Sequence, residues 1–450
     1  MVDLDDIIKA YDVRGTYPDQ LNAGLARQVG AAFVRVLGAA GGAIVVGRDM
    51  RPSGPELVAA FAEGATAKGA DVILMGLAST DGLYFASGHL NLPGAMFTAS
   101  HNPAKYNGIK LCRPGAAPVG QDTGLREIKQ MIRDGIPAYD GPHGVVREQD
   151  LTQAYGVFLR GLVDIAGIRP LKVVVDAGNG MGGYTVPVVL QGLPLEITPL
   201  YFELDGNFPN HEANPIDPEN LRDLQAAVMA QGADIGLAFD GDADRCFVVD
   251  ERGRIVNPST LTSLIAVREL AKHPGAHIIH NLITSAAVSE VISEHGGIPV
   301  RTRVGHSFIK QRMAETGAVF GGEHSGHFYF ADFWNADSGM LAALHTLSAL
   351  GTTPAGTTLS SMLAPYERYC MSGEINSRVD DAAAKVAAVR AAFAARTTTD
   401  ELDGVTFQGP GWWFNLRSSN TEPLLRLNVE APTPQAVQAL VDEVLAIVRN

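Results

Sequence analysis

The sequence has few cysteines, no long apolar run and fewer basic than acidic residues. Its three cysteines, Cys112, Cys246 and Cys370, are odd in number, far apart and without metal-ligand spacing, which excludes a disulfide scaffold and favours a reducing cytoplasm. No apolar run approaches the ~20 residues that a membrane-spanning helix needs. A formal charge of −14 argues against nucleic acid and anionic membranes as partners. An anionic ligand would therefore need a local basic cluster.

What is present is enough apolar sequence for several cores, since 46% of the 450 residues are hydrophobic. Helical spacing over residues 21–37 is followed by a β-branched strand, a second helix and a second strand within residues 43–75. The alternation restarts at residues 171–176 and again at 277–279. It predicts three similar α/β domains with mixed, mostly parallel sheets covered by helices.

The last part of the chain has a different order of elements. An Ala-rich helix over residues 380–395 precedes several short strands within residues 405–429, and a helix over 434–448 closes the chain. Clustered strands flanked by helices predict a smaller C-terminal α+β domain. The expected domains are residues 1–148, 149–252, 253–365 and 366–450.

The segment Thr98-Ala-Ser-His-Asn-Pro103 follows the apolar run 94–97, which has the character of a buried strand, and ends in the turn dipeptide Asn-Pro. We expect the Ser100 hydroxyl to be open to solvent there, where it could carry a phosphoryl group. Taken alone, these six residues favour an ordinary loop with a capping serine.

Three carboxylates alternate in Asp240-Gly-Asp242-Ala-Asp244-Arg245, directly after the apolar strand 235–239. Such a loop can converge on one hard divalent cation such as Mg²⁺. An EF-hand calcium loop is the competing interpretation. It fails because Arg245 occupies the position that needs glycine and because residues 246–249 continue as a strand.

A third segment contains the pattern G-x-G-x-x-G at Gly178, Gly180 and Gly183, with Glu203 placed 20 residues further on. A dinucleotide site is the functional interpretation. We favour a structural strand-to-helix turn, because the segment lies far along the chain from the other motifs and such turns are common without a nucleotide.

Two polar segments follow in the second half. The loop Gly321-Gly-Glu-His-Ser-Gly-His327 offers groups that can bind the hydroxyls of a polyol, and His306 opens a helix whose N–H groups could meet a phosphate. Arg417-Ser-Ser-Asn-Thr-Glu-Pro423, with Arg426 nearby, has the composition of a phosphate receptor, because guanidinium geometry matches phosphate oxygens.

These motifs together resemble the α-D-phosphohexomutase family, closest to its phosphomannomutase/phosphoglucomutase members. The matching segments are TASHNP with YNGIK (106–110), DGDADR, GEHSGH and RSSNTEP, in that order and spread over all four expected domains. The resemblance implies three α/β domains and a smaller fourth one around a central cleft. It also implies a phosphorylated serine at Ser100.

The family mechanism that the resemblance implies is reversible exchange between hexose 1-phosphate and hexose 6-phosphate through a phosphoserine and a hexose 1,6-bisphosphate. By resemblance, the ligands of Mg²⁺ are Ser100, Asp240, Asp242 and Asp244, and the groups acting around the phosphoserine are His101, Lys110, Arg14, Arg245 and His306. The implied substrate contacts are Glu323, Ser325, His327, Arg417, Ser419, Asn420, Thr421 and Arg426. The implied partners are small hexose phosphates. The protein itself is expected to be a monomer or a homodimer.

The preferred hexose stays open at this stage. Glu323 and Ser325 match residues that hold the 3- and 4-hydroxyls, which glucose and mannose share. His324 departs from the methionine frequent in glucose/mannose mutases and from the glutamine of glucosamine mutases. Mannose and glucose phosphates are the expected substrates. The alternatives are a phosphoglucosamine mutase and a phosphoserine-type sugar phosphatase.

Overall fold

The computed structural model describes residues 3–418 and 424–449, and the contacts within the chain divide it into two units. Unit 1 comprises Met1–Asn257 and Ser325–Met362, and unit 2 comprises Pro258–His324 and Leu363–Asn450. The short helix α13 (Leu359–Leu363) crosses from one to the other. The boundary at 324/325 therefore falls inside the polar loop 321–327.

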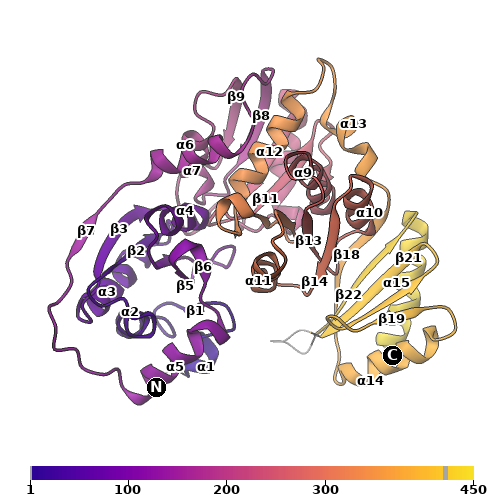
Figure 1. Cartoon of the computed structure of the whole chain (residues 1–450). Coiled ribbons are helices and arrows are strands. Elements are labelled where there is room, and N and C mark those ends of the chain that lie inside the picture. Colours follow the sequence, from indigo (N-terminus) through magenta and orange to yellow (C-terminus); the bar gives the residue numbers. More distant parts are fainter. Residues whose placement is uncertain (1–2, 419–423, 450) are drawn as a thin grey trace. The chain divides into compact units, whose positions relative to one another are not determined.

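A seven-stranded mixed sheet forms the first part of unit 1 (Figure 1). Its strands are β1 (Val13–Thr16), β2 (Ala43–Arg48), β3 (Asp71–Leu77), β4 (Gly94–Phe97), β5 (Tyr106–Arg113), β6 (Ala117–Pro118) and β7 (Val146–Glu148). The order is β1-β5-β4-β2-β3-β7, with β6 beside β5. Strands β4, β2, β3 and β7 are mutually parallel, whereas β5 runs antiparallel to β4 and β1.

Helices cover this sheet because its central strands β2, β3 and β4 are mainly apolar. They are α1 (Leu4–Ile7), α2 (Ala23–Leu37), α3 (Gly54–Thr66), α4 (Thr80–Leu90) and α5 (Leu125–Asp134). Both α3 and α4 pack on β2, whose four central residues are buried. Helix α2 begins at Asn22, whose side chain accepts from the Leu25 N–H at 3.1 Å, and ends at Gly38 with φ 63°. The expected helix and strand order of this region is confirmed.

A second mixed sheet completes most of unit 1. Its strands are β8 (Leu171–Asp176), β9 (Leu195–Leu200), β10 (Ile235–Phe239), β11 (Cys246–Asp250) and β12 (Ile255–Val256). The helices are α6 (Thr152–Leu162), α7 (Gly182–Val189) and α8 (Arg222–Gln231). Strands β8, β9 and β10 are parallel, and β11 returns antiparallel to β10 with Phe239 opposite Cys246. Residues 240–245 are therefore a hairpin loop, hereafter the carboxylate loop.

The returning segment of unit 1 adds the antiparallel pair β16 (Phe328–Phe330) and β17 (Ala336–Asp337) and the helix α12 (Gly339–Gly351). Every residue of α12 is buried. Most of its residues are apolar, as burial on all sides requires, and the buried hydroxyls of Thr346 and Ser348 donate to the Ala342 and Asp164 carbonyls.

Unit 2 contains a parallel group of strands and an antiparallel sheet. The parallel strands are β13 (His277–Asn281), β14 (Ile298–Thr302) and β15 (Phe320–Gly322), with helices α9 (Pro258–Lys272), α10 (Ala286–Glu294) and α11 (His306–Thr316). The antiparallel sheet has the order β18 (Cys370–Arg378), β22 (Leu424–Ala431), β21 (Trp412–Ser418), β20 (Val405–Gly409) and β19 (Thr398–Asp400). Helices α14 (Ala382–Phe393) and α15 (Pro434–Val448) complete it.

The antiparallel sheet buries its own core, in which Phe407 and Phe414 stack with ring centroids 4.5 Å apart. Helix α14 is shorter than the predicted 380–395, because the Asp381 side chain accepts from the Ala384 N–H at 2.9 Å and caps the helix at that point. Helix α15 covers the predicted residues 434–448.

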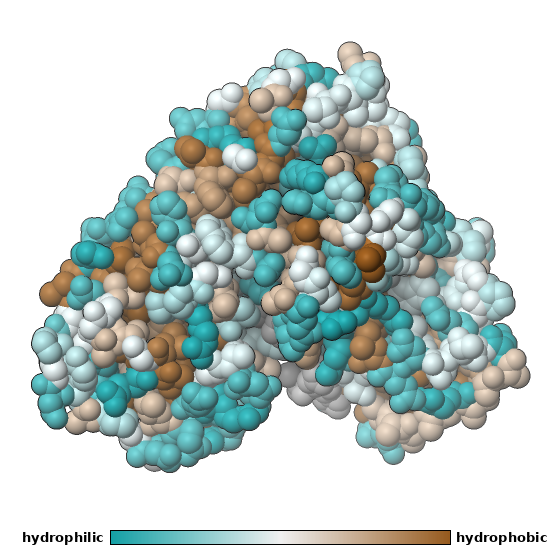
Figure 2. All heavy atoms as spheres, viewed as in Figure 1, coloured by the Kyte–Doolittle hydropathy of each residue, from teal (hydrophilic) through white to brown (hydrophobic). Residues whose placement is uncertain are grey.

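Polar and apolar residues are interleaved over the face of the molecule that Figure 2 shows. Among residues 3–418 and 424–449, no helix is long and apolar enough to cross a membrane.

Candidate active site

Ser100 lies in the turn that follows β4, as predicted, but its hydroxyl is not open to solvent. The residue is 6% exposed and has φ 49°, and its N–H donates to Thr98 Oγ1 at 2.9 Å. The backbone of the carboxylate loop covers this turn: a Cβ added at Gly241 would lie 2.4 Å from the Ser100 carbonyl oxygen. The expectation of an exposed serine was wrong because the covering loop comes from 140 positions further along the chain. Residues 98–103 are called the serine turn below.

The carboxylate loop brings the three predicted aspartates together. Asp240, Asp242 and Asp244 are fully buried, and a carboxylate oxygen of each lies within 4.8 Å of the others. The Ser100 hydroxyl donates to Asp240 Oδ2 at 2.8 Å. The four side chains that the sequence assigns to one cation thus meet at one place.

Burial and mutual repulsion divide these carboxyl groups into two kinds. Burial, followed by the charges of Asp244 and Asp242, raises the pKa of Asp240 to about 7, against the lowering effect of Arg245. Burial also raises the pKa values of Asp242 and Asp244, but the Lys110 ammonium and further donors lower them by more, so both end below the usual value. Of the three carboxyl groups, Asp240 is therefore the one whose negative charge is least stabilised by its protein neighbours.

Two cations compensate the loop. Lys110 on β5 donates to Asp242 Oδ2 at 2.8 Å and to Asp244 Oδ2 at 2.6 Å. Arg245 donates through Nε to Asp240 Oδ2 at 2.8 Å and through Nη2 to the Ser100 hydroxyl at 3.1 Å. Both were expected beside the serine. Arg245 contacts Ser100 directly, whereas Lys110 contacts two of the aspartates of the carboxylate loop.

His101 is also at this position, with Nδ1 3.3 Å from the Ser100 hydroxyl and in contact with Arg245 Nη2. Burial, with the charge of Arg245, lowers the pKa of His101 to about 2. The ring is therefore neutral at pH 7, and its free nitrogen is an acceptor rather than a charged donor.

Arg14 on β1 holds the serine turn from the opposite strand. It donates to the Ala99 carbonyl at 2.9 Å and to Asn102 Oδ1 at 2.5 Å, and it pairs with Asp12 at 2.5 Å. Its place beside the turn follows from the register of β1 against β5, in which Arg14 faces Gly108.

The side chains gathered here are suitable ligands for a hard divalent cation. The ligand atoms are carboxylate and hydroxyl oxygens, which Mg²⁺ prefers. Asp242 Oδ1 is buried and has no hydrogen-bond partner within the described part of the chain. A buried acceptor without a donor is costly unless a cation completes it, so the residues present suit such an ion.

His327 joins this cluster from the returning segment of unit 1. Its Nε2 lies 3.5 Å from Asp244 Oδ1, and its Nδ1 lies 3.0 Å from the Ser325 hydroxyl. Burial lowers the pKa of His327, but Asp244 raises it by more. Asp244, His327 and Asp337 also offer ligand atoms within 4.8 Å of one another.

Glu323 and His324 belong to unit 2. Glu323 is buried, and its Oε1 accepts from Asn281 Nδ2 at 3.3 Å and from the Gly305 N–H at 3.2 Å. The same Asn281 amide lies 3.2 Å from His324 Nδ1. Asn281 therefore orients both residues, a role that its position at the end of β13 did not reveal.

The predicted phosphate receptor is partly described. Arg417 and Arg426, hereafter the arginine pair, face one another across β21 and β22. Arg417 donates to Glu374 Oε2 at 3.1 Å, and Arg426 Nε lies 3.6 Å from Glu374 Oε1. Ser419, Asn420 and Thr421 lie outside the described residues. Helix α11 does begin at His306, whose side chain is likewise outside the described part.

Sequence reasoning missed a group behind the carboxylate loop. Thr80, at the start of α4, donates through Oγ1 to Asp242 Oδ2 at 2.6 Å and through its N–H to the Asp242 carbonyl at 3.0 Å. The neighbouring Asp81 is buried and accepts from Tyr155 and Ser338 at 2.7 and 2.6 Å. Burial raises the pKa of Asp81 to about 7. The one sequence signal for Thr80 and Asp81 is the helix-start pattern Ser-Thr-Asp at residues 79–81.

The glycine-rich segment is a tight turn, but it is not remote from the site. A Cβ at Gly183 would lie 2.2 Å from the Phe202 carbonyl oxygen, which explains that glycine by close packing. The Met181 N–H donates to the Gly241 carbonyl at 2.9 Å, and a Cβ at Gly180 would lie 2.8 Å from the same oxygen. The expectation that this turn is remote from the site was wrong, because the turn supports the carboxylate loop directly, through the parallel pairing of β8 with β10.

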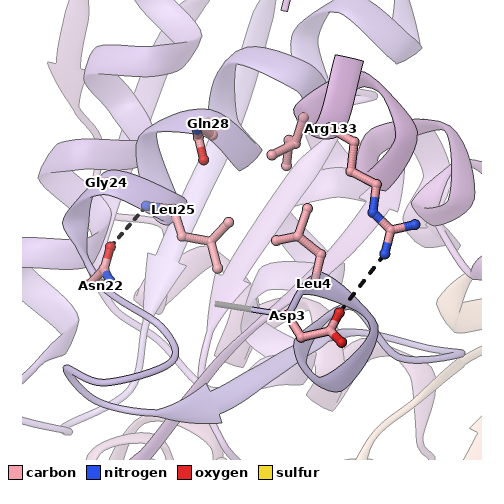
Figure 3. A pocket seen from close by; sticks show the side chains of 8 residues that line it. Asp3, Leu4, Asn22, Gly24, Leu25, Gln28 and Arg133 are labelled. Atoms are coloured by element: carbon pink, nitrogen blue, oxygen red, sulfur yellow. Dashed lines mark hydrogen bonds and ion pairs between the residues drawn. The ribbon is translucent and has the colours of Figure 1, made fainter. Parts of the chain in front are cut away.

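A separate cavity of about 800 Å³ lies near the N-terminus, where α1, α2 and α5 contribute Leu4, Leu25 and Arg133 to its lining (Figure 3). None of the predicted site residues lines it. Two interactions stabilise its lining. Asn22 caps α2, and Arg133 pairs with Asp5 at 2.7 Å.

Comparison with known proteins agrees with the four motifs. Models of the phosphoglucomutase/phosphomannomutase family match in order: α/β/α domain I at residues 5–137, domain II at 157–253, domain III at 257–369 and the C-terminal domain at 374–447. The fold prediction of three α/β domains and a smaller C-terminal one is thereby confirmed.

Complete relatives give the same result. The chain is 43% identical over 425 residues to a protein of Xanthomonas campestris pv. campestris named "Phosphohexose mutases", with 94% of each chain covered. It is 39% identical over 453 residues to a phosphomannomutase of Escherichia coli, covering 98% of each. A solved phosphoglucomutase/phosphomannomutase family protein from Burkholderia thailandensis matches with a TM-score of 0.89 and 34% identity, over 100% of this chain and 98% of that one. The chain therefore belongs to the phosphoglucomutase/phosphomannomutase family and is an enzyme of the isomerase class.

Proposed function

We propose that this enzyme interconverts hexose 1-phosphate and hexose 6-phosphate, with Ser100 as the phosphoryl carrier and a hexose 1,6-bisphosphate as the intermediate. The observation that supports it best is the Ser100 hydroxyl itself, which is bonded to Asp240 and Arg245 inside a cluster of three buried carboxylates. A serine that only caps a turn requires neither charged partners nor a cluster of buried carboxylates. The names of the relatives, a phosphomannomutase and phosphohexose mutases, point to the same reaction.

Residues of unit 1 would carry the transfer step. The free hydroxyl oxygen of the bound hexose monophosphate attacks the phosphorus, the bond between phosphorus and Ser100 Oγ breaks, and the hydroxyl proton passes to a base. Arg245 donates to Ser100 Oγ and stabilises the charge that develops on this leaving oxygen. The reverse transfer from the bisphosphate's other phosphate restores the phosphoserine. The three aspartates would hold Mg²⁺, which neutralises charge on the transferring group.

The two nearby imidazoles differ in what they can do. His101 is kept neutral and bonded beside the serine, so it is suited to orienting Ser100 rather than to donating a proton. The pKa of His327 is raised, and it is paired with Asp244 and Ser325. We assign His327 as the proton carrier and sugar contact, because its pairing with Asp244 favours the protonated imidazole, which can donate a proton.

Unit 2 would select the hexose and hold its non-reacting phosphate. Glu323, fixed by Asn281 and Gly305, is a buried acceptor suited to sugar hydroxyls, and the arginine pair is suited to a phosphate. We infer mannose and glucose phosphates as substrates, and a cytoplasmic enzyme with free thiols at Cys112, Cys246 and Cys370.

A coupled assay tests this function. Mannose, glucose and glucosamine 1-phosphates are offered with Mg²⁺ and a hexose 1,6-bisphosphate to the wild type, to Ser100→Ala and to Ser293→Ala, an exposed helix serine as matched control. We expect 6-phosphate products from mannose and glucose, a loss of at least about a thousandfold in kcat for Ser100→Ala, and no change for the control. Mass spectrometry should locate the phosphoryl group on Ser100.

Other products would refute the proposal. Inorganic phosphate as the main product would indicate a phosphatase, and a glucosamine preference would indicate a different mutase. Full activity of Ser100→Ala would remove the serine from the mechanism.

A further inference from the structure

We propose that Arg51 is the positioning residue that sets the shape of the serine turn and thereby the location of the Ser100 hydroxyl. The inference rests on the proposed role of Ser100. Arg51 is completely buried and lies just beyond the end of β2, next to the parallel strand β4 from which the serine turn continues.

The guanidinium of Arg51 gathers four carbonyl oxygens of the turn and its exit. Nη2 donates to the Ser100 carbonyl at 2.9 Å and to the Asn102 carbonyl at 2.6 Å. Nη1 donates to the Pro103 carbonyl at 3.0 Å and to the Tyr106 carbonyl at 2.9 Å. Because all four carbonyl oxygens face the same guanidinium, the backbone between them must curve around Arg51.

The fifth donor, Nε, bonds Asp49 Oδ2 at 3.2 Å, and Asp49 is itself fully buried. A guanidinium has five N–H donors, so each one of Arg51 has an acceptor. Arg51 therefore has no donor left for a substrate or a phosphate. Its effect on the reaction must pass through the backbone it holds, which distinguishes it from Arg14 and Arg245.

The backbone held in this way is strained. Ser100 has φ 49°, in the left-handed region that residues other than glycine seldom occupy, and its carbonyl is packed against Gly241 on the other side. A strained conformation persists only where the surroundings fix it. Arg51 and the carboxylate loop both contact the Ser100 carbonyl, from two sides, and together they direct its side chain toward Asp240.

A segment of the second sheet region covers the guanidinium. The Phe208 ring lies 5.2 Å from the Arg51 guanidinium carbon, and a Cβ at Gly206 would lie 2.7 Å from Arg51 Cα. Water is thereby kept from the bonds to the turn. Phe208 can be changed without removing any of these bonds.

Arg51→Lys is the principal test, because lysine keeps the charge but offers three donors without the planar fork. Arg126→Lys, at an exposed arginine paired with Asp122 in the same unit, is the matched control. Both are measured with Phe208→Leu and the wild type, at a temperature where each is fully folded by circular dichroism. Mutase kinetics are combined with hydrogen exchange of peptides covering residues 98–108 and of peptides from α15.

For Arg51→Lys we expect kcat to fall at least about tenfold, with KM for the hexose phosphate within threefold of the wild-type value. Amide exchange in residues 98–108 should accelerate about tenfold, while exchange in α15 is unchanged. Phe208→Leu should show the same pattern at roughly a third of the size, and Arg126→Lys should show neither change.

Two results would overturn the inference: a folded Arg51→Lys enzyme with wild-type kcat, or acceleration of exchange spread over the whole chain. If Arg51→Lys does not fold, unchanged exchange of residues 98–108 in Phe208→Leu would refute it. The exchange measurement needs no mutase activity. A wild type without such activity would therefore refute the proposed function and leave the hold of Arg51 on the turn to be judged separately.

Discussion

The carboxylate loop of unit 1 and the arginine pair of unit 2 each gather like charges, but the protein compensates them differently. Asp240, Asp242 and Asp244 are fully buried and bonded to Lys110 and Arg245. The arginine pair shares one carboxylate, Glu374, and the Arg426 side chain is 31% exposed. The first arrangement fixes atoms in place. The second leaves positive charge for the phosphate that we propose it binds.

This difference predicts where substitutions appear in the kinetics. A group that is fixed around the transferring phosphoryl acts in the transition state, so its loss lowers kcat. A group that holds the non-reacting phosphate acts equally in the ground and transition states, so its loss raises KM. The comparison fails if substitutions in the two regions cannot be told apart in this way.

Asp242→Asn should have the largest effect. The amide keeps the size of the side chain and can still accept from Thr80, but it removes the charge that faces Lys110 and the proposed cation. We expect kcat to fall by about a thousandfold, with KM for the hexose phosphate changed less than threefold. The measurement is steady-state kinetics over a Mg²⁺ titration.

Asp122→Asn is the control, because Asp122 is exposed and pairs only with a neighbouring surface arginine among the described contacts. A rise in KM with normal kcat for Asp242→Asn would contradict the assignment of the loop to the transferring phosphoryl.

Arg417→Lys should have an intermediate effect of the opposite kind. Arg417 is 7% exposed and donates to Glu374, and lysine cannot reproduce a two-point contact with phosphate. We expect KM to rise about tenfold, which corresponds to about 1.4 kcal/mol of binding, with kcat within threefold of the wild-type value. Glu374→Gln should lower KM, because the carboxylate that competes for both arginines loses its charge.

The control for unit 2 is Arg390→Lys, at an exposed arginine paired with Glu401 at 2.5 Å. A fall in kcat of Arg417→Lys that matches that of Asp242→Asn would show that the two regions act on the same step.

Within the site of unit 1, the residues differ in how far the sequence revealed them. The aspartates and Ser100 stand at strand ends, where local patterns predict both the strand and the loop after it, and the structure brings them together. Arg51 and Thr80 act on Ser100 and Asp242 from elsewhere in the chain, and nothing in their own neighbourhood records that contact. The burial of Ser100 was missed for the same reason.

The fold was more accessible to prediction than the site, because periodicity is a local property. Strands β8 and β10 and helix α15 have the residues that the patterns indicated. The antiparallel return of β11 is what turns Asp240–Arg245 into a hairpin loop. That pairing is set by contacts between strands, which the pattern of a single strand does not contain.

The smallest expected effect concerns the stability of the carboxylate loop at different pH values. The pKa of Asp240 is raised to about 7, mainly by burial, against about 3.9 in an unfolded chain. Between these values the folded protein binds more protons than the unfolded one, so without a divalent cation its stability falls as the pH rises. Mg²⁺ bound to the ionised carboxylates would remove this loss. The rise in Tm that Mg²⁺ produces should therefore be small near about pH 5 and larger, on the order of 5 °C, near about pH 8.

Asp240→Asn separates this effect from that of Asp81, whose pKa is also raised to about 7 but which bonds Tyr155 and Ser338 instead of facing the loop's cation site. The variant should keep the part of the pH dependence that comes from Asp81 and lose most of the pH-dependent response to Mg²⁺. Thermal melts in Mg²⁺ and in a chelator, at both pH values, give the four numbers required for each protein. A Mg²⁺ response that is the same at both pH values in the wild type would mean that the cation does not compete with the proton on Asp240, and the carboxylate loop would then need no partner beyond Lys110 and Arg245.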